Sequence, residues 1–132
     1  MFSRRNLLAA TFAVGAAFAV NAQTPGPNQA KFSMDAFQAA QKAGKPVIVE
    51  VHADWCPVCT RQKPISANLR AKGDFKNAAF FVIDFDNQAD ALKALKVTRQ
   101  STIITYKCAK ETGRSTGVTD PAKIEAQFRS AL

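Results

Sequence analysis

The sequence is poor in the residues that build disulfide frameworks and metal clusters. It has three cysteines and one histidine in 132 residues, so a disulfide network cannot hold the bulk of the fold together. A zinc site on the close pair Cys56 and Cys59 needs two more ligands, and only His52 and Cys108 remain of the preferred types. The close pair therefore acts locally, and we expect no resident metal and no organic cofactor.

Long hydrophobic runs and clustered charge are also scarce. Apart from residues 7–20, no apolar stretch approaches the roughly twenty residues that cross a membrane, so we expect a soluble mature protein without a stable membrane span. Lys and Arg number 18 against 10 Asp and Glu. These basic residues are scattered and not interleaved with aromatics, which indicates a solvated surface rather than nucleic-acid binding.

The first 22 residues have the pattern of a signal peptide. A basic head at residues 4–5 precedes an apolar stretch over residues 7–20 and a small-residue ending at residues 20–22. This order predicts cleavage after residue 22 and an exported, periplasmic-type product, with a retained N-terminal anchor as the alternative. Residues 3–8 resemble the twin-arginine export signal without the lysine that usually follows, so the export route stays open.

The remaining chain predicts a tether and one folded domain. Residues 23–30, QTPGPNQA, bear proline and glycine and offer nothing to bury, so we expect them to be disordered. The domain then occupies residues 31–132, which is enough chain for one compact core and not for two.

Periodicity and capping signals predict four helices and four strands in this domain. The helices are expected over residues 33–44, 58–72, 87–95 and 120–132. The strands are expected over residues 47–53, 78–86, 101–107 and 111–117. Side-chain caps are expected at Ser33, Asn87 and Asp120, a stop signal at Gly44, a helix interruption at Pro64, and an apolar stripe at Ile124, Phe128 and Leu132.

The order of these elements indicates the fold class. Strands that alternate with helices are typical of a parallel arrangement, whereas the last two strands form an antiparallel hairpin. We therefore predict an α/β fold with a mixed central β-sheet and helices on both faces. The strand at residues 47–53 has valines on one face and Ile48, Glu50 and His52 on the other, and this apolar character places it in the middle of the sheet.

The stretch HADWCPVCTRQKP, from His52 to Pro64, carries a resemblance to a known family. Together with the element order it resembles the thioredoxin-like superfamily over most of residues 31–132. The matching positions are the Trp55-Cys56-Pro57-Val58-Cys59 motif, Glu50 where the family usually has Asp, the Ala53-Asp54-Trp55 lead-in, Pro64, Gly117, and residues 97–102 opposite the cysteines. The resemblance implies a thioredoxin-like fold and a redox-active disulfide between Cys56 and Cys59. The implied partners are protein dithiols and disulfides and an electron-transfer protein.

One position departs from the family's pattern. Ser101 stands where the family nearly always has a cis-proline, and the expected Thr102 follows it. A cis bond before serine costs about 2.5–4 kcal/mol, so we predict a trans peptide and a loop that differs in shape from the family's or stores strain. In the family the residue before the proline, here Gln100, pairs its backbone with a substrate strand.

The spacing of the two thiols suits reversible redox chemistry. Cys56 lies at a helix N-terminus, whose N–H groups stabilise the thiolate, and we expect its sulfur to be exposed and to act as the nucleophile. Cys59, one turn deeper, then resolves the mixed disulfide. Pro57 and Val58 between them carry no charge, so we expect a reductant or mild exchanger rather than a strong oxidant.

Neighbouring residues are assigned supporting roles, each with a simpler alternative. Burial should raise the pKa of Glu50, which makes it a candidate proton shuttle for Cys59, or else it is an ion-pair member. His52 in its charged form would lower the Cys56 pKa, or else it only packs. Trp55 shields the disulfide and offers a flat apolar contact, or again only packs.

Three alternatives remain open at this level. Cys108 in the predicted hairpin turn is read as a free thiol in a monomer, but it could form a dimer-linking disulfide or take a thiol adduct. The CxxC pair could bind a metal. The domain could also be a non-catalytic binding or chaperone-like module, a possibility that Ser101 favours because it alters the docking loop.

Overall fold

The structure is a computed structural model that describes residues 28–132. The expected signal peptide and the tether up to residue 27 lie outside the described residues. The helices are α1 (Met34–Lys42), α2 (Pro57–Arg70), α3 (Ala89–Ala94), α4 (Pro121–Arg129) and the short 3-10 helix η1 (Gly73–Phe75). The strands are β1 (Ala30–Lys31), β2 (Pro46–His52), β3 (Ala79–Asp84), β4 (Thr102–Lys107) and β5 (Lys110–Thr116).

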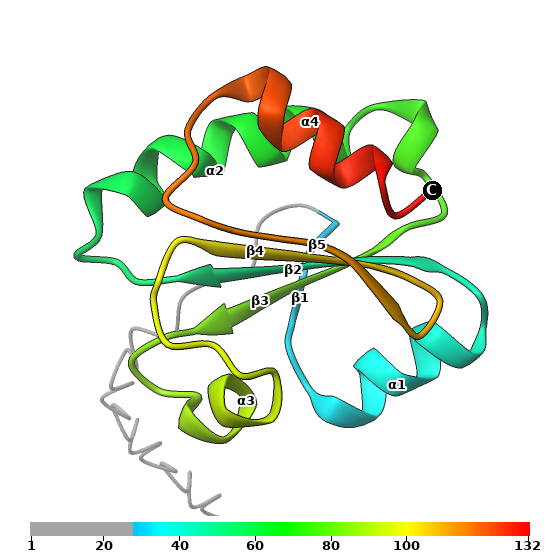
Figure 1. Ribbon diagram of the computed structural model, residues 1–132, viewed down its shortest axis with the longest axis horizontal. Coiled ribbons are helices and arrows are strands. Elements are labelled where there is room, and N and C mark those ends of the chain that lie inside the picture. Colours follow the sequence, from blue (N-terminus) through cyan, green and yellow to red (C-terminus); the bar gives the residue numbers. More distant parts are fainter. Residues whose placement is uncertain (1–27) are drawn as a thin grey trace, which may run out of the picture.

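A five-stranded mixed sheet with the order β1-β3-β2-β4-β5 forms the middle layer. β1 and β2 run parallel to β3, whereas β4 runs antiparallel to both β2 and β5. Helices α2 and α4 cover one face of the sheet and α1 and α3 cover the other (Figure 1). The predicted α/β class, with a mixed central sheet and helices on both faces, is confirmed.

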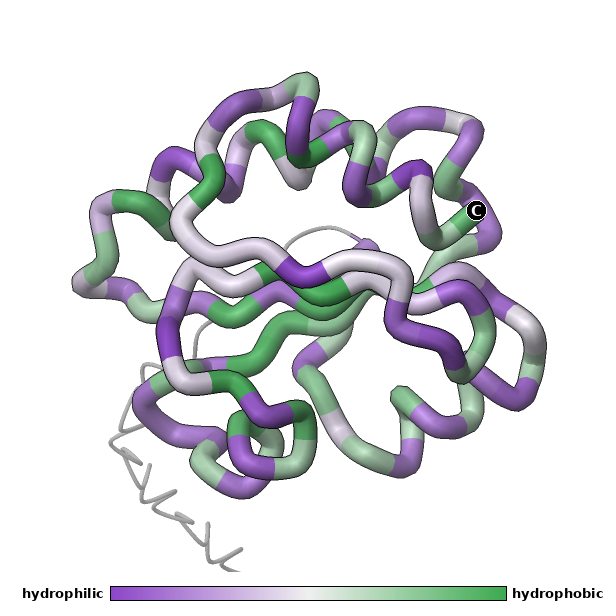
Figure 2. Tube along the Cα trace, viewed as in Figure 1, coloured by the Kyte–Doolittle hydropathy of each residue, from purple (hydrophilic) through white to green (hydrophobic). Residues whose placement is uncertain are grey.

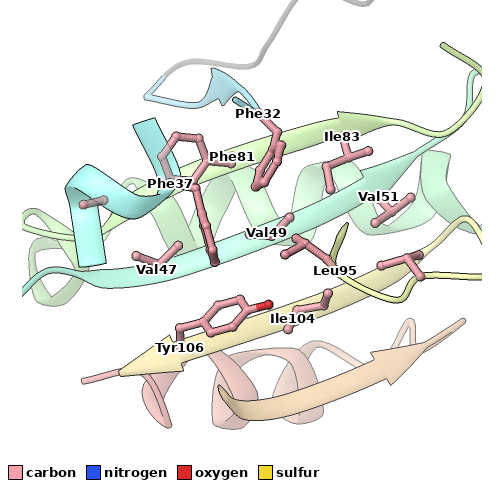
Figure 3. Packing of buried hydrophobic residues seen from close by; sticks show 12 residues of the cluster. Phe32, Phe37, Val47, Val49, Val51, Phe81, Ile83, Leu95, Ile104 and Tyr106 are labelled. Carbon is pink, nitrogen blue, oxygen red and sulfur yellow. The ribbon is translucent and has the colours of Figure 1, made fainter. Parts of the chain in front are cut away.

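Apolar side chains cover β2 on both sides. Val47, Val49 and Val51 point to the face of α1 and α3 and pack into one buried cluster (Figure 3). Ile48 points to the other face and joins a second cluster under α2 and α4. Hydrophobic residues accordingly dominate β3 in the middle of the molecule, while hydrophilic residues are common in the outer loops (Figure 2). Each buried side chain contributes about 1.5–3 kcal/mol, which makes β2 a firm base for the cysteines that follow it.

Local signals in the sequence set most helix ends. The Ser33 hydroxyl accepts a hydrogen bond from the Ala36 N–H at 3.2 Å, and the Asp120 carboxylate accepts one from the Lys123 N–H at 3.0 Å. Gly44 ends the first helical segment with a φ of +73°, a left-handed conformation that glycine adopts without strain. These three predicted signals are confirmed.

The start of the domain differs from the prediction. Ala30, which was expected in a disordered tether, begins β1 and pairs in register with Phe81 of β3. A strand of two residues is too short to show an alternating pattern, so the sequence carried no sign of it.

Two further expectations were wrong near helix ends. The N-cap of α3 is Gln88 rather than Asn87, because the Asn87 side chain instead donates a hydrogen bond to Asp84 at 2.7 Å. Leu132 is 43% exposed and does not continue the apolar stripe, since α4 ends at Arg129 and the chain turns so that Ala131 is buried instead. No helix within residues 28–132 combines the length and apolar character needed to cross a membrane.

Candidate active site

Cys56 and Cys59 lie where β2 passes into α2. Cys56 is the N-cap residue of α2 and has extended backbone angles, and its sulfur accepts a hydrogen bond from the Cys59 N–H at 3.3 Å. Its sulfur therefore takes the place of the serine or aspartate oxygen that usually caps a helix. Pro57 follows at the first helical position, where a missing N–H costs nothing. The helix thus presents its positive end to the Cys56 sulfur.

Both cysteines are reduced and buried. Each is 2% exposed, and they form a small cluster with Ala53, with Val58 and Phe85 packed against it. The expectation that the Cys56 sulfur faces solvent is therefore wrong, because the side chain folds back to cap its own helix. The side chains around it have to shift before a protein partner can reach the sulfur.

Hydrogen bonds lower the pKa of Cys56 despite its burial. Burial by itself raises the pKa of a thiol because it disfavours the charged thiolate. Hydrogen bonds from the Cys59 thiol and from the backbone N–H groups of Cys59 and Val58 act against burial, and the Gln100 side chain adds to them. The net effect lowers the pKa of Cys56 below its usual value of 9.0, so the thiolate is favoured at this position.

The second thiol behaves in the opposite way. Burial, followed by the hydrogen bond and charge of Cys56, raises the pKa of Cys59 to about 11. Its sulfur lies 3.9 Å from the Val51 carbonyl oxygen, which can accept its proton in a hydrogen bond. Of the two thiols, Cys56 therefore gives up its proton first, and Cys59 needs a base before it can attack.

Glu50 lies on β2, and its side chain is largely buried and ion-paired. Its Oε2 accepts hydrogen bonds from the Gln29 side-chain amide at 2.7 Å and from the Arg70 guanidinium at 3.0 Å. Burial outweighs these contacts and raises the pKa of the Glu50 carboxyl above its usual 4.5. The raised pKa and the ion pair, which were expected as alternatives, occur together. Arg70 and Gln29 were not among the predicted site residues, since neither belongs to a motif.

Glu50 and Cys59 line the same cavity. It has a volume of about 320 Å³, and its walls include Glu50, His52, Cys59, Lys63 and Arg70. A water molecule occupies about 30 Å³ of the liquid, so this space suffices for water that would link Glu50 to the Cys59 sulfur. The Glu50 carboxyl and the Cys59 thiol thus line one space that is large enough to hold water.

His52 cannot supply the positive charge that was considered for it. The ring is 7% exposed, and its Nε2 lies 3.2 Å from the Asp54 carboxylate. Burial and the charge of Lys63 lower the pKa of His52 below 6.5, and they outweigh the opposing effect of Asp54 and Asp84. His52 is therefore neutral at pH 7, and its ring packs beneath the motif as a hydrogen-bonded side chain.

Trp55 is exposed beside the cysteines. It is 58% exposed, and its indole N–H donates to both carboxylate oxygens of Asp86, at 3.0 and 3.1 Å. Its ring meets Phe85 edge to face, with centroids 6.4 Å apart. The side chain is thus held in place while much of its surface stays exposed.

The loop opposite the cysteines has an uncommon backbone. Residues 28–132 contain no cis peptide bond, so the predicted trans peptide before Ser101 is confirmed. Ser101 has a φ of +57°, a left-handed conformation that few residues other than glycine adopt. Its N–H donates to the Val51 carbonyl at 2.9 Å and its carbonyl accepts from Gln62 at 3.2 Å. Gln62 was not among the predicted site residues.

Cys108 lies far from this site along the sheet. It is exposed in the turn between β4 and β5, at the opposite end of β4 from Ser101. A strand of this length separates the two ends by about 20 Å, so Cys108 cannot complete a metal site with Cys56 and Cys59. Within the described part of the chain, no three His, Cys, Asp or Glu side chains are grouped as metal ligands.

Comparison with known proteins gives a consistent result. Residues 28–130 match the family model described as Thioredoxin. The thioredoxin Asp f 29 of Aspergillus fumigatus is 30% identical over 93 residues, which cover 70% of this chain and 84% of that protein. The thioredoxin of Callithrix jacchus is 32% identical over 96 residues, which cover 71% of this chain and 89% of that protein.

A solved structure shows the same similarity in three dimensions. The crystal structure of Trxlp from Edwardsiella tarda superposes with a TM-score of 0.74 at 39% identity, and the match covers 76% of this chain and 97% of that one. The family match spans the sheet, its helices and the helix-capping thiol pair. The chain therefore belongs to the thioredoxin family and is a thiol–disulfide oxidoreductase.

Proposed function

We propose that the protein exchanges dithiols and disulfides with protein substrates outside the cytoplasm, through Cys56 as nucleophile and Cys59 as resolving thiol. The observation that carries the proposal is the Cys56 sulfur at the N-cap of α2, where the pKa of Cys56 is lowered while that of Cys59 is raised. Only the thiolate attacks a disulfide, so the two shifts distinguish the roles of the two sulfurs.

The reaction proceeds in two exchanges. The Cys56 thiolate attacks one sulfur of a substrate disulfide, forms a mixed disulfide and releases the other substrate sulfur as a thiolate that takes up a proton. Cys59 then loses its proton and attacks the Cys56 sulfur, which releases the second substrate thiolate. The substrate has gained two electrons, and the protein holds a Cys56–Cys59 disulfide.

Glu50 is the proposed proton acceptor for the second exchange. It lines the same cavity as Cys59, and burial keeps its pKa above the usual value of 4.5. A raised pKa makes the carboxylate a stronger base, which suits proton transfer from a thiol. Arg70 at 3.0 Å stabilises the carboxylate that accepts the proton.

We expect the couple to act as a reductant or a mild exchanger. Pro57 and Val58 are uncharged, and His52 is neutral at pH 7 because its pKa is lowered. The main groups that lower the pKa of Cys56 are the Cys59 thiol, the backbone N–H groups of Cys59 and Val58, and the Gln100 side chain, all of them uncharged hydrogen-bond donors. Strong oxidants stabilise the thiolate of the reduced form much further, which makes their disulfide more easily reduced.

Substrates are proposed to dock on Trp55 and Gln100. Trp55 offers an exposed aromatic surface. Among the described residues, the Gln100 backbone N–H and C=O form no hydrogen bond, and an extended peptide can pair with such free groups. The proposed location outside the cytoplasm rests on the signal-peptide pattern of residues 1–22. Cleavage after residue 22 predicts a mature chain that begins at Gln23. N-terminal sequencing of the exported product tests this prediction.

Insulin reduction driven by dithiothreitol tests the catalytic roles. We expect turnover by the wild type, none by Cys56→Ser, and a trapped mixed disulfide with Cys59→Ser. Cys108→Ser is the matched control, because it removes an exposed thiol at the other end of β4 and should retain full activity. Equal activity of wild type and Cys56→Ser would contradict the proposal.

One observation favours a second candidate function. Cys56 is 2% exposed and the loop beside it departs from the family pattern at Ser101, which suits a binding module whose thiols are not used. A wild type that binds unfolded insulin but never reduces it would support this alternative against the catalytic one.

A further inference from the structure

The loop that faces the cysteines is fixed without a proline. Ser101 is 5% exposed and has a φ of +57°. A non-glycine residue keeps such a conformation only where surrounding contacts hold it. The start of β4, the segment after β5 and the start of α2 come together at this end of the sheet (Figure 1), so contacts from these three segments decide the shape of the loop.

Hydrogen bonds hold both backbone groups of Ser101. Its N–H donates to the Val51 carbonyl of β2 at 2.9 Å. Its carbonyl accepts from the Gly117 N–H at 3.0 Å and from the Gln62 side-chain amide at 3.2 Å. The same Gln62 amide donates to the Val118 carbonyl at 2.8 Å. Gln62 is therefore the one side chain in this set, and it ties α2 to the segments on either side of the β4–β5 hairpin.

The position of Gln62 on α2 links it directly to the thiols. It follows Cys59 by three residues, so the two side chains lie on the same face of the helix. Gln62 is 6% exposed, and an amide without charge can be buried there once both of its N–H groups find acceptors. The helix turn that carries the resolving thiol thus also carries the donor that holds the opposing loop.

The loop lies next to the thiol pair, because the Val51 carbonyl oxygen that accepts from the Ser101 N–H also lies 3.9 Å from the Cys59 sulfur. The Gln100 side chain adds to the hydrogen bonds that lower the pKa of Cys56. A backbone hydrogen bond from Ser101 acts on Cys59 and partly offsets the burial that raises its pKa. A displaced Ser101 would move both contacts at once, because Gln100 is its direct neighbour in the chain.

We propose that Gln62 is a positioning residue for the exchange reaction: its side-chain amide holds the Ser101 carbonyl and thereby fixes the loop of Gln100 and Ser101 beside the thiol pair. The inference rests on the proposed role of Cys56 as the attacking thiolate. The side-chain hydrogen bonds of Gln62 thus fix a loop that has Ser101 where the family has a proline.

Replacement of Gln62 by methionine tests the proposal. Gln62→Met keeps the length and volume of the side chain and removes both donors. The full chain is reduced, and alkylation of Cys56 by iodoacetamide is followed against pH by mass spectrometry of the Cys56 peptide. We expect the alkylation midpoint to rise by about half a pH unit or more, which corresponds to about a threefold change in the proton equilibrium. The equilibrium of the Cys56–Cys59 couple with glutathione should shift toward the protein disulfide by a similar factor.

Gln127 offers a matched control. Its side-chain amide donates to the Ile103 carbonyl on β4 at 2.8 Å and accepts from the Ser115 hydroxyl at 2.6 Å. Gln127→Met therefore removes comparable hydrogen bonds from a glutamine on α4 that contacts neither sulfur. It should lower the melting temperature and leave both the alkylation midpoint and the glutathione equilibrium unchanged.

A second variant keeps the test informative if Gln62→Met fails to fold. Ser101→Gly adopts a φ of +57° without strain and retains the bonds from Val51, Gly117 and Gln62, so the Cys56 midpoint should equal that of the wild type. A midpoint that rises in Ser101→Gly, or that stays unchanged in folded Gln62→Met, would overturn the inference. A wild-type alkylation midpoint of Cys56 equal to that of an ordinary thiol would instead refute the role of Cys56 as the attacking thiolate. Failure of the Gln62 inference and failure of the proposed function therefore give different results.

Discussion

Replacement of Arg70 by methionine provides a sharp test of the buried ion pair. The guanidinium donates to the Glu50 carboxylate at 3.0 Å, and the two side chains are 6% and 13% exposed. Arg70 also lies over the Phe80 ring, 5.9 Å from its centroid. Methionine retains an apolar stem against that ring, so Arg70→Met removes the charge while it largely preserves the packing.

The expected loss is large at neutral pH. Two unit charges 3.0 Å apart attract by about 5 kcal/mol at an effective dielectric constant of about 20. Removal of one partner of a buried pair costs about 3–5 kcal/mol, because the other charge stays buried without compensation. We therefore expect Arg70→Met to lower the free energy of unfolding by about 3–5 kcal/mol once Glu50 is ionised.

The loss should depend on pH with a definite sign. Burial raises the pKa of folded Glu50 above 4.5, so between 4.5 and the folded pKa the native state binds more protons than the unfolded state. Stability accordingly falls as pH rises through this window and then levels off. Arg70→Met raises the folded pKa of Glu50 further, so the variant keeps losing stability above the pH at which the wild type levels off. The difference between the two proteins must grow with pH.

Urea unfolding followed by circular dichroism, on reduced protein from pH 4.5 to 8, measures this difference. Arg129→Met is the matched control, because Arg129 pairs with Glu125 and Asp74 on the surface and lies 5.7 Å over the Phe75 ring. Its effect should be small and should not grow with pH, since water screens exposed pairs. An Arg70→Met deficit of the same size at every pH would refute the reasoning.

Three further predictions concern single residues of the site. Ser101→Pro should destabilise the protein by about 1–3 kcal/mol in urea unfolding, because it removes the N–H that pairs with the Val51 carbonyl and excludes the φ of +57°; equal or greater stability would contradict this. Trp55→Ala should raise the KM for insulin while the unfolding midpoint barely changes, since the side chain is 58% exposed; a fall in kcat at unchanged KM would speak against docking. Glu50→Gln should slow decay of the mixed disulfide by about a hundredfold in quenched-flow measurements, and an unchanged decay rate would exclude the shuttle.

Much of the fold follows from local rules in the sequence. Val47, Val49 and Val51 alternate with Ile48 because successive side chains of a strand point to opposite faces, and the structure buries both sets. Ser33 and Asp120 cap helices because their oxygens satisfy N–H groups within three residues. Such rules failed at Asn87, whose side chain bonds to Asp84, at Leu132, which lies beyond the end of α4, and at Pro64, across which α2 continues without the predicted interruption.

The thiol pair was equally visible from the sequence, but its surroundings were not. The spacing of Cys56 and Cys59 places one sulfur at the first turn of the helix, which requires no tertiary information. The burial of Cys56 was predicted wrongly, because the motif does not reveal that the sulfur folds back onto the Cys59 N–H. The trans peptide at Ser101 followed from the energy of cis bonds, whereas its left-handed φ depends on contacts with distant segments.

The sequence by itself thus determined the strand at the centre of the sheet, the helix that starts at the cysteines and the chemistry available to two thiols, since each depends on residues a few positions apart. Only the tertiary structure decided which side chains tune that chemistry. Gln62 reaches Ser101 across 39 positions and Arg70 reaches Glu50 across 20. The packing of α2 on the sheet brings these partners together. Hydrogen bonds and ion pairs depend on distance in space, and a local sequence pattern does not determine the distance between residues far apart in the chain.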